Sequence, residues 1–273
     1  MLEQYSKVTQ ETAENLRIID DALFRLIAEK KEVCQEILRT LLDMPNLKVL
    51  SVKAQHLIKS LHREITLDAL CILDNGSLGN IEMQKGNAND DIARTRFHAS
   101  AITAQYTPKG TDFSDIPDIT ILYITEYDAL RNNQTVTHVS RCMKTEKGYT
   151  PVDDGEDIIF ANTYVNDGSD KSELLQLMLN KKSFYNEKFP AISNAVKYFK
   201  DTEGGRGEVC KSVEIYAKEY AKEYAKEYAR KIREEDIQKM LRAGKTASQI
   251  ADFCGYDLTE VEEAEKALLS TAE

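Results

Sequence analysis

Residues 65–84 read ITLDALCILDNGSLGNIEMQ. Two apolar runs flank the turn sequence Asp74-Asn75-Gly76, a pattern typical of a β-hairpin. Side chains alternate along a strand, so Asp68 is expected on one face of the first strand. It would share that face with Leu70 and Ile72, opposite Ile65, Leu67, Ala69 and Cys71. Glu82 and Gln84 point the same way in the second strand, so pairing would bring Asp68 and Glu82 together with Gln84 beside them.

Two convergent carboxylates suit a hard divalent ion. Asp is disfavoured in strands, so Asp68 inside an apolar run needs a reason. Mg²⁺ takes carboxylate oxygens and keeps waters that a phosphate can displace, and Mn²⁺ is expected to substitute for it. Such an ion polarises a scissile phosphate and promotes hydroxide formation from water. The spacing alone is a weak motif, because two ordinary polar positions on a half-exposed sheet also explain it.

The surrounding sequence alternates between helical and strand patterns. Residues 20–42 have the apolar spacing of one amphipathic helix, and residues 89–107 return to that periodicity. The predicted strands are 49–55, 63–73, 78–86, 118–125, 136–144 and 157–165. From Lys171 the pattern is helical almost to the end. The front half therefore follows the order helix, three strands, helix, strand.

The chain resembles the recombination-promoting nuclease and transposase family of the PD-(D/E)xK superfamily. The resemblance rests on Asp68 followed by IEMQ, on Arg94 with Phe97-His98, and on residues 109–125 and 152–165. It covers roughly residues 20–200 and implies an α/β (α+β) fold with a restriction-endonuclease-like αβββαβ core. It also implies divalent-metal-dependent cleavage of DNA phosphodiester bonds, linked to recombination or mobile elements. By position, Asp68 and Glu82 would be metal ligands.

Two details depart from the family pattern, and a third stays open. Gln84 occupies the position of the superfamily's lysine, and it can bond a water or a phosphate oxygen but carries no charge. The family's two aromatic residues after the helix arginine are Phe97-His98 here. An acid on the first helix also serves many such sites, and Glu29, Glu32 and Glu36 are equally available. A catalytically inactive nuclease fold that acts as an oligomeric interaction module is therefore the alternative reading.

Several cations are candidates for contact with DNA phosphates. Arg94 could clamp a phosphate with two hydrogen bonds, although a helix-surface salt bridge explains it equally well. Residues 47–63 contain Lys53, Lys59 and Arg63 and no acid, which fits a phosphate-contacting stretch or a solvated surface.

The back of the chain divides into a predicted arm (201–243) and a small helical tail (244–273), after a nuclease-like domain (1–200). YAKE recurs from Tyr216, and the repeat predicts a long helix with an aromatic stripe. The arm is either a solvated spacer or a docking helix, and a homodimer is expected with the arm as one route to it. The tail resembles a helix-turn-helix. Its last helix is acidic, which favours packing over DNA reading.

Composition excludes several classes of protein. The formal net charge is −10, which argues against a non-specific nucleic-acid coat. Five scattered cysteines predict reduced thiols, and the start of the sequence lacks a signal-peptide pattern, so a cytoplasmic protein is expected. No apolar run is long enough for a membrane span. The sequence lacks a P-loop motif, so no nucleotide cofactor is expected.

Overall fold

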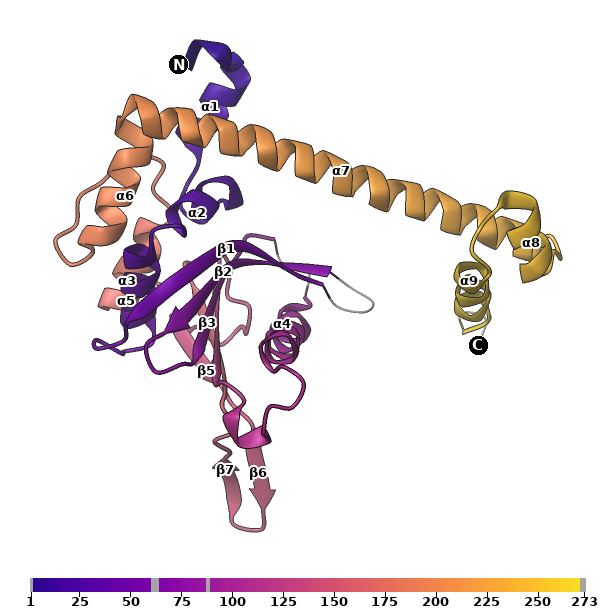
Figure 1. Cartoon of the computed structure of the whole chain (residues 1–273), viewed down its shortest axis with the longest axis horizontal. Coiled ribbons are helices and arrows are strands. Elements are labelled where there is room, and N and C mark those ends of the chain that lie inside the picture. Colours follow the sequence, from indigo (N-terminus) through magenta and orange to yellow (C-terminus); the bar gives the residue numbers. More distant parts are fainter. Residues whose placement is uncertain (1, 60–63, 87–88, 271–273) are drawn as a thin grey trace. The chain divides into compact units, whose positions relative to one another are not determined.

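The computed structural model describes residues 2–59, 64–86 and 89–270. The chain forms two compact units, residues 1–214 and 215–273, and the long helix α7 (Glu203–Arg242) belongs in part to each (Figure 1). The three-part division expected from the sequence stays a prediction.

A mixed sheet is the centre of the first unit. Within the described residues it has six strands in the order β1-β2-β3-β4-β8-β5. The strands β1 (Val49–Lys59), β2 (Glu64–Leu73) and β3 (Leu78–Gln84) pair antiparallel. The strands β3, β4 (Ile119–Thr125) and β8 (Glu156–Asn162) run parallel, and β5 (Val136–Val139) is antiparallel to β8. The expected hairpin is confirmed, with Ala69 opposite Ile81.

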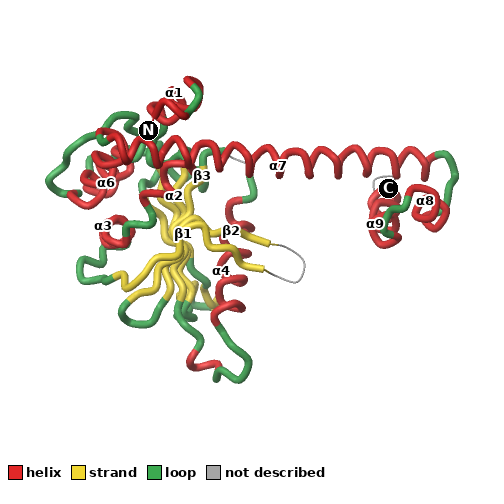
Figure 2. The backbone as a smooth tube through the Cα atoms, turned by 45° about the horizontal axis from the view of Figure 1, so that its top comes forward, coloured by secondary structure: helices red, strands yellow, loops and turns green. Residues whose placement is uncertain are grey.

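Helices cover both faces of this sheet (Figure 2). One face packs against α2 (Asp21–Ile27), α3 (Lys31–Leu41), α5 (Asp170–Leu177), α6 (Pro190–Asp201) and the start of α7. The helix α4 (Asp91–Tyr106) covers the other face through Ala99 and Ile102. Shorter elements complete the unit: η1 (Leu2–Gln4), α1 (Lys7–Asn15) and η2 (Phe113–Asp115). The expected αβββαβ core, with a helical C-terminal part, is confirmed.

The single helix expected over residues 20–42 is wrong, because the chain breaks between α2 and α3. The break falls at Ala28, Glu29 and Lys30, which contain neither proline nor glycine. The buried Cys34 thiol donates a hydrogen bond to the Ala28 carbonyl at the break (3.3 Å). Both helices still bury their apolar faces in one core, which is why the spacing looked continuous.

The strand expected over residues 136–144 is also two strands. The first part is β5, in the large sheet. The second is β6 (Cys142–Thr145), which pairs with β7 (Gly148–Pro151) in a separate two-stranded hairpin. All residues of β6 and β7 are exposed. Their sequence therefore has no pattern of buried apolar positions that would distinguish β6 from β5.

The strict alternation expected along β2 fails at Asp68. Ile65 and Leu67 pack on the α4 side of the sheet, whereas Ala69 and Cys71 pack on the other side. On the neighbouring strand, Gln55 stands between the partners of Ala69 and Leu67 and has φ +50°. A left-handed conformation is uncommon for a residue other than glycine. This irregularity accompanies the change of face at the residue that matters most for the site.

The second unit contains the exposed part of α7 and a small helical bundle. Helices α8 (Ala247–Cys254) and α9 (Leu258–Ser270) bury Ile250 and Val261 against Ile237 of α7. Thr246 and Gln249 form a capping box at the start of α8, and Gly255 ends it with φ +68°. Along the arm, the rings of Tyr216, Tyr220, Tyr224 and Tyr228 stack at 6.3–6.5 Å between centroids.

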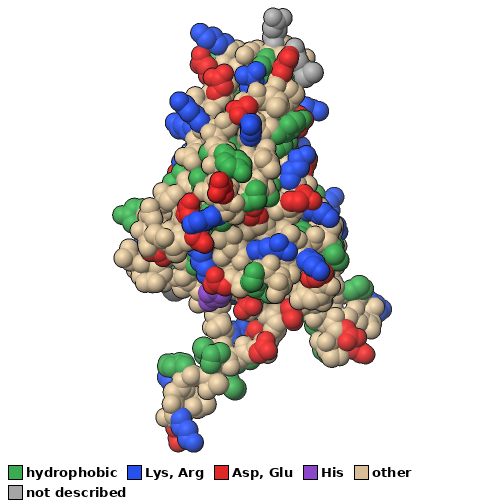
Figure 3. Space-filling model, turned by 90° about the vertical axis from the view of Figure 1, so that its left-hand side faces the viewer, with side chains coloured by type: hydrophobic (Ala, Val, Ile, Leu, Met, Phe, Trp, Pro, Cys, Tyr) green, Lys and Arg blue, Asp and Glu red, His purple; other side chains and the backbone are tan. Residues whose placement is uncertain are grey.

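Charged side chains of both signs are distributed over the surface. On the face drawn in Figure 3, basic and acidic groups are interspersed, so the net negative charge is not collected there. All five cysteines are free thiols, and Cys34, Cys71 and Cys210 are buried. Among the described residues, no helix combines the length and apolar character needed to cross a membrane.

Candidate active site

The site lies where β2 separates from β3. The last paired residues of these strands are Ala69 and Ile81, whereas β3 continues beside β4 as far as Gln84. At the separation, Asp68 takes over a backbone hydrogen bond: its Oδ2 accepts the Met83 N–H at 2.9 Å. Its Oδ1 accepts the Gln55 side-chain amide at 3.3 Å. The carboxylate is therefore fixed at the edge of the opening between the strands.

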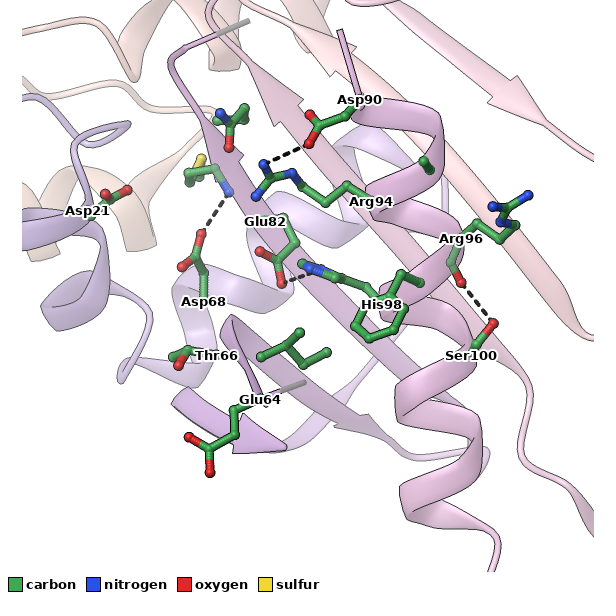
Figure 4. A pocket seen from close by; sticks show the side chains of 15 residues that line it. Asp21, Glu64, Thr66, Asp68, Glu82, Asp90, Arg94, Arg96, His98 and Ser100 are labelled. Atoms are coloured by element: carbon green, nitrogen blue, oxygen red, sulfur yellow. Dashed lines mark hydrogen bonds and ion pairs between the residues drawn. The ribbon is translucent and has the colours of Figure 1, made fainter. Parts of the chain in front are cut away.

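Glu82 lies on β3 with its carboxylate toward α4. Its side chain is buried, and Oε1 accepts a hydrogen bond from the Asn80 amide at 2.7 Å. The same oxygen lies 3.4 Å from Nδ1 of His98, which is also buried. Figure 4 shows Asp68 and Glu82 facing the same space from adjacent strands. The convergence of the two carboxylates expected from the hairpin is therefore present in the geometry.

These groups line a cleft of about 610 Å³. The wall on the sheet side includes Asp68, Glu82, Met83 and Gln84, and the α4 side includes Arg94, Phe97 and His98. Asp21, at the start of α2, also lines the cleft (Figure 4). With Glu64 on β2 and Asp90 at the start of α4, four parts of the chain contribute acids to one opening.

Acids outnumber basic side chains in the cleft lining, where the basic groups are Arg94, Arg96 and His98. The pKa of Asp68 is raised well above its usual range, first because the carboxyl is buried and then because Glu82 and Asp21 are negative. A divalent cation would relieve this repulsion, so the donor set fits a hard ion that oxygen atoms bind. Within the described residues, no group of three or more Asp, Glu, His or Cys side chains is arranged as a complete ligand set. Mg²⁺ commonly uses one or two carboxylates together with waters and substrate phosphates, which fits a pair of carboxylates.

Gln84 lines the cleft, but its amide is partly committed. Nε2 donates a hydrogen bond to the Gly86 carbonyl at 2.6 Å. The next residue, Lys85, does not line the cleft, and its ammonium binds Asp20 at 2.7 Å. Lys85 therefore does not supply the positive charge that the superfamily's lysine would provide at position 84.

The acid that α2 contributes to the cleft is one that the sequence did not single out. Asp21 lines the cleft, whereas Glu29, Glu32 and Glu36 do not. Glu36 instead accepts the backbone N–H groups of Ala191 and Ile192 at the start of α6 (3.0 and 2.8 Å). The only sequence signal for Asp21 is its place in the first turn of α2, which is a common position for any acid.

The predicted phosphate-contacting cations occupy different places. Arg94 lines the cleft and forms an ion pair with Asp90 at 3.3 Å. Lys53 lies on β1 outside the cleft and donates to the Tyr106 hydroxyl at 2.9 Å. Lys59 is exposed at the end of β1, also outside the cleft lining. Arg63 lies outside the described residues.

The first unit is a mixed α/β domain that combines three antiparallel strands, a crossover helix and two acids at a strand separation. The profile of the PD-(D/E)XK nuclease family transposases matches residues 21–177, more than half of the chain. The chain belongs to this family, whose members generally use divalent metal ions. Searches of curated proteins and of solved structures find no match. Family membership suggests a nuclease that acts on DNA.

Proposed function

We propose that the protein is a metal-dependent DNA endonuclease that hydrolyses phosphodiester bonds, linked to DNA recombination or mobile elements. The observation that carries the proposal is the convergence of Asp68 and Glu82 on one cleft, inside a domain of a nuclease family. The raised pKa of Asp68 supports a cation as the missing component, because that shift arises from burial and from neighbouring negative charge.

Asp68 and Glu82 would hold Mg²⁺, for which Mn²⁺ substitutes. When bound, the ion supplies polarisation of the phosphate and a lowered pKa for an attacking water. Hydrogen bonds hold both carboxylates in place without the ion. Asp68 is held by Gln55 and the Met83 N–H, and Glu82 is held by Asn80. Asp21 adds a further acid to the lining of the cleft.

The other cleft residues would orient the substrate. The Oε1 atom of Gln84 can accept a hydrogen bond from the attacking water, since its Nε2 is already bonded to Gly86. The Arg94 guanidinium can bind a phosphate oxygen and still remain beside Asp90. Lys53 and Lys59 on β1 would guide the DNA backbone, and Arg63, which lies outside the described residues, is proposed for the same role.

A homodimer is part of the proposal, since two copies could cut opposite strands. The exposed rings of Tyr220, Tyr224 and Tyr228 on the arm offer a surface for a second copy, and their i,i+4 stacking also stabilises a solitary helix. The sedimentation coefficient of the full chain, measured over a range of concentrations with and without DNA, tests this part.

Metal-free protein should bind Mn²⁺, and Glu82→Ala should abolish that binding. Electron paramagnetic resonance of free Mn²⁺ measures it without substrate. Wild-type protein that binds no Mn²⁺ and cuts no DNA would favour the inactive interaction module instead. The absence of a charged side chain at Gln84 is the observation behind that alternative.

A further inference from the structure

We propose that His98 and Asn80 are positioning residues that hold Glu82 through Oε1 and leave Oε2 to face the metal ion. This inference rests on the proposed function, since it concerns how the same site binds its ion. It assigns roles to two buried polar residues that the carboxylate motif does not include.

The first step is burial. Asn80 is fully buried, and Glu82 and His98 are 6% and 7% exposed. Polar side chains this deep in a sheet–helix interface are normally hydrogen-bonded. Asn80 uses its amide nitrogen on Glu82, and its carbonyl oxygen has no partner among the described residues. The three side chains therefore form a small polar cluster between β3 and α4.

The second step is the geometry at Glu82. Both Asn80 Nδ2, at 2.7 Å, and His98 Nδ1, at 3.4 Å, approach the same oxygen, Oε1. The His98 contact is within ion-pair distance, but it is not aligned as a hydrogen bond, and Nδ1 has no hydrogen-bond partner among the described residues. Hydrogen bonds in active sites are often long and poorly aligned before ligands arrive. With the proton on Nδ1, a small closure makes His98 the second donor to Oε1.

The third step is the helix that carries His98. His98 and Arg94 are four residues apart on α4, so their side chains are neighbours on one face. Arg94 is paired with Asp90. When His98 and Asn80 hold Glu82, the Glu82 carboxylate stays directed at the metal position. Arg94 then remains available to bind a phosphate. Figure 4 shows His98 in contact with Glu82 and Arg94 in contact with Asp90.

The position of α4 is itself fixed. Asp91, at its first turn, accepts hydrogen bonds from the hydroxyls of Tyr123 at 3.1 Å and Tyr127 at 2.6 Å. Asp91 and Tyr123 are buried, so this contact ties the helix to β4. His98 thus reaches Glu82 from a helix that is anchored to the sheet.

The test measures Mn²⁺ affinity in the absence of DNA, by electron paramagnetic resonance, for three variants of one residue. His98→Ala removes the donor and should weaken Mn²⁺ binding about 10–100-fold, the usual effect of losing a group that supports a metal ligand. His98→Asn keeps an amide N–H near the position of Nδ1 and should restore most of the affinity. His98→Gln carries its amide farther out, near the position of Nε2, and should resemble His98→Ala.

Two controls keep the outcomes separate. His138→Ala changes an exposed histidine on β5 and should leave Mn²⁺ affinity unchanged. Asn80→Ala should weaken binding like His98→Ala, and urea unfolding of each variant identifies any that fail to fold. If His98→Ala binds Mn²⁺ as tightly as the wild type while Glu82→Ala does not bind, the positioning role is wrong and the metal site stands. If Glu82→Ala itself binds normally, both the metal site and the inference are wrong.

Discussion

The carboxylate of Asp68 on β2 accepts the backbone N–H of Met83 on β3 at 2.9 Å. The contact lies just beyond the last residue pair of the two strands, Ala69 and Ile81. A side chain thus takes the place of a strand-to-strand backbone bond where the cleft opens. One residue both ends the pairing of the strands and faces the proposed metal position.

Because Asp68 has both roles, two substitutions at this residue should differ in stability although both abolish cleavage. Asp68→Asn keeps an oxygen for the Met83 N–H and removes the carboxylate that would bind the metal ion, so the protein should stay folded and lose cleavage. Asp68→Ala also leaves the N–H without an acceptor and should unfold about 1–3 kcal/mol more easily than Asp68→Asn. Urea unfolding monitored by circular dichroism compares the two. Equal stability would show that the Met83 contact contributes nothing.

Arg94 should act on DNA and not on the metal ion. Arg94→Ala should reduce DNA affinity about 10–100-fold, the value of one or two hydrogen bonds to a charged group, with Mn²⁺ affinity unchanged. Asp90→Asn is the matched variant, because it removes the partner and leaves the arginine. It should retain DNA binding. If Asp90→Asn is as defective as Arg94→Ala, the ion pair serves the helix and the phosphate role is wrong.

The uncharged side chain of Gln84 should lower the rate of DNA cleavage. Gln84→Lys introduces the cation of the superfamily pattern beside Asp68 and Glu82. The cleavage rate should rise at least about tenfold, which is less than the full rate enhancement that a proton-transferring side chain usually gives. Gln84→Met, similar in length and uncharged, is the control. A lower rate for Gln84→Lys than for the wild type would show that the amide is required.

The sequence was sufficient for the hairpin and its two acids, because a turn between alternating apolar runs is a local signal. It could not identify Asp21, because a first-turn acid on α2 reaches the cleft only through tertiary packing. The contact between His98 and Glu82 has the same origin, since α4 connects β3 to β4 and meets Glu82 only by packing on the sheet. The break at Ala28 was hidden for another reason: α2 and α3 face one core, so their apolar spacing continues across it.

The boundary between the two units predicts where the chain can be shortened. A protein that ends after Glu214 keeps Val209 and Cys210 in the core, and also the bond from Ser212 to the Ala22 carbonyl (2.6 Å). It should fold and cleave DNA at a rate close to that of the full chain. A protein that ends after Gly205 lacks these residues and should be less stable by more than about 1.5 kcal/mol, the value of one buried side chain of valine size. Loss of cleavage in the longer fragment, with its fold intact, would show that cleavage requires the arm, either directly or through the dimer.

The central claim is tested most directly by cleavage of supercoiled and linear DNA in Mg²⁺, in Mn²⁺ and in EDTA. The wild type is compared with Asp68→Asn and Glu82→Gln, all purified identically. We expect cutting by the wild type in either metal, none in EDTA, and none by the two variants in any condition. Cutting by Asp68→Asn or Glu82→Gln at the wild-type rate would contradict the assignment of the active site to these two carboxylates.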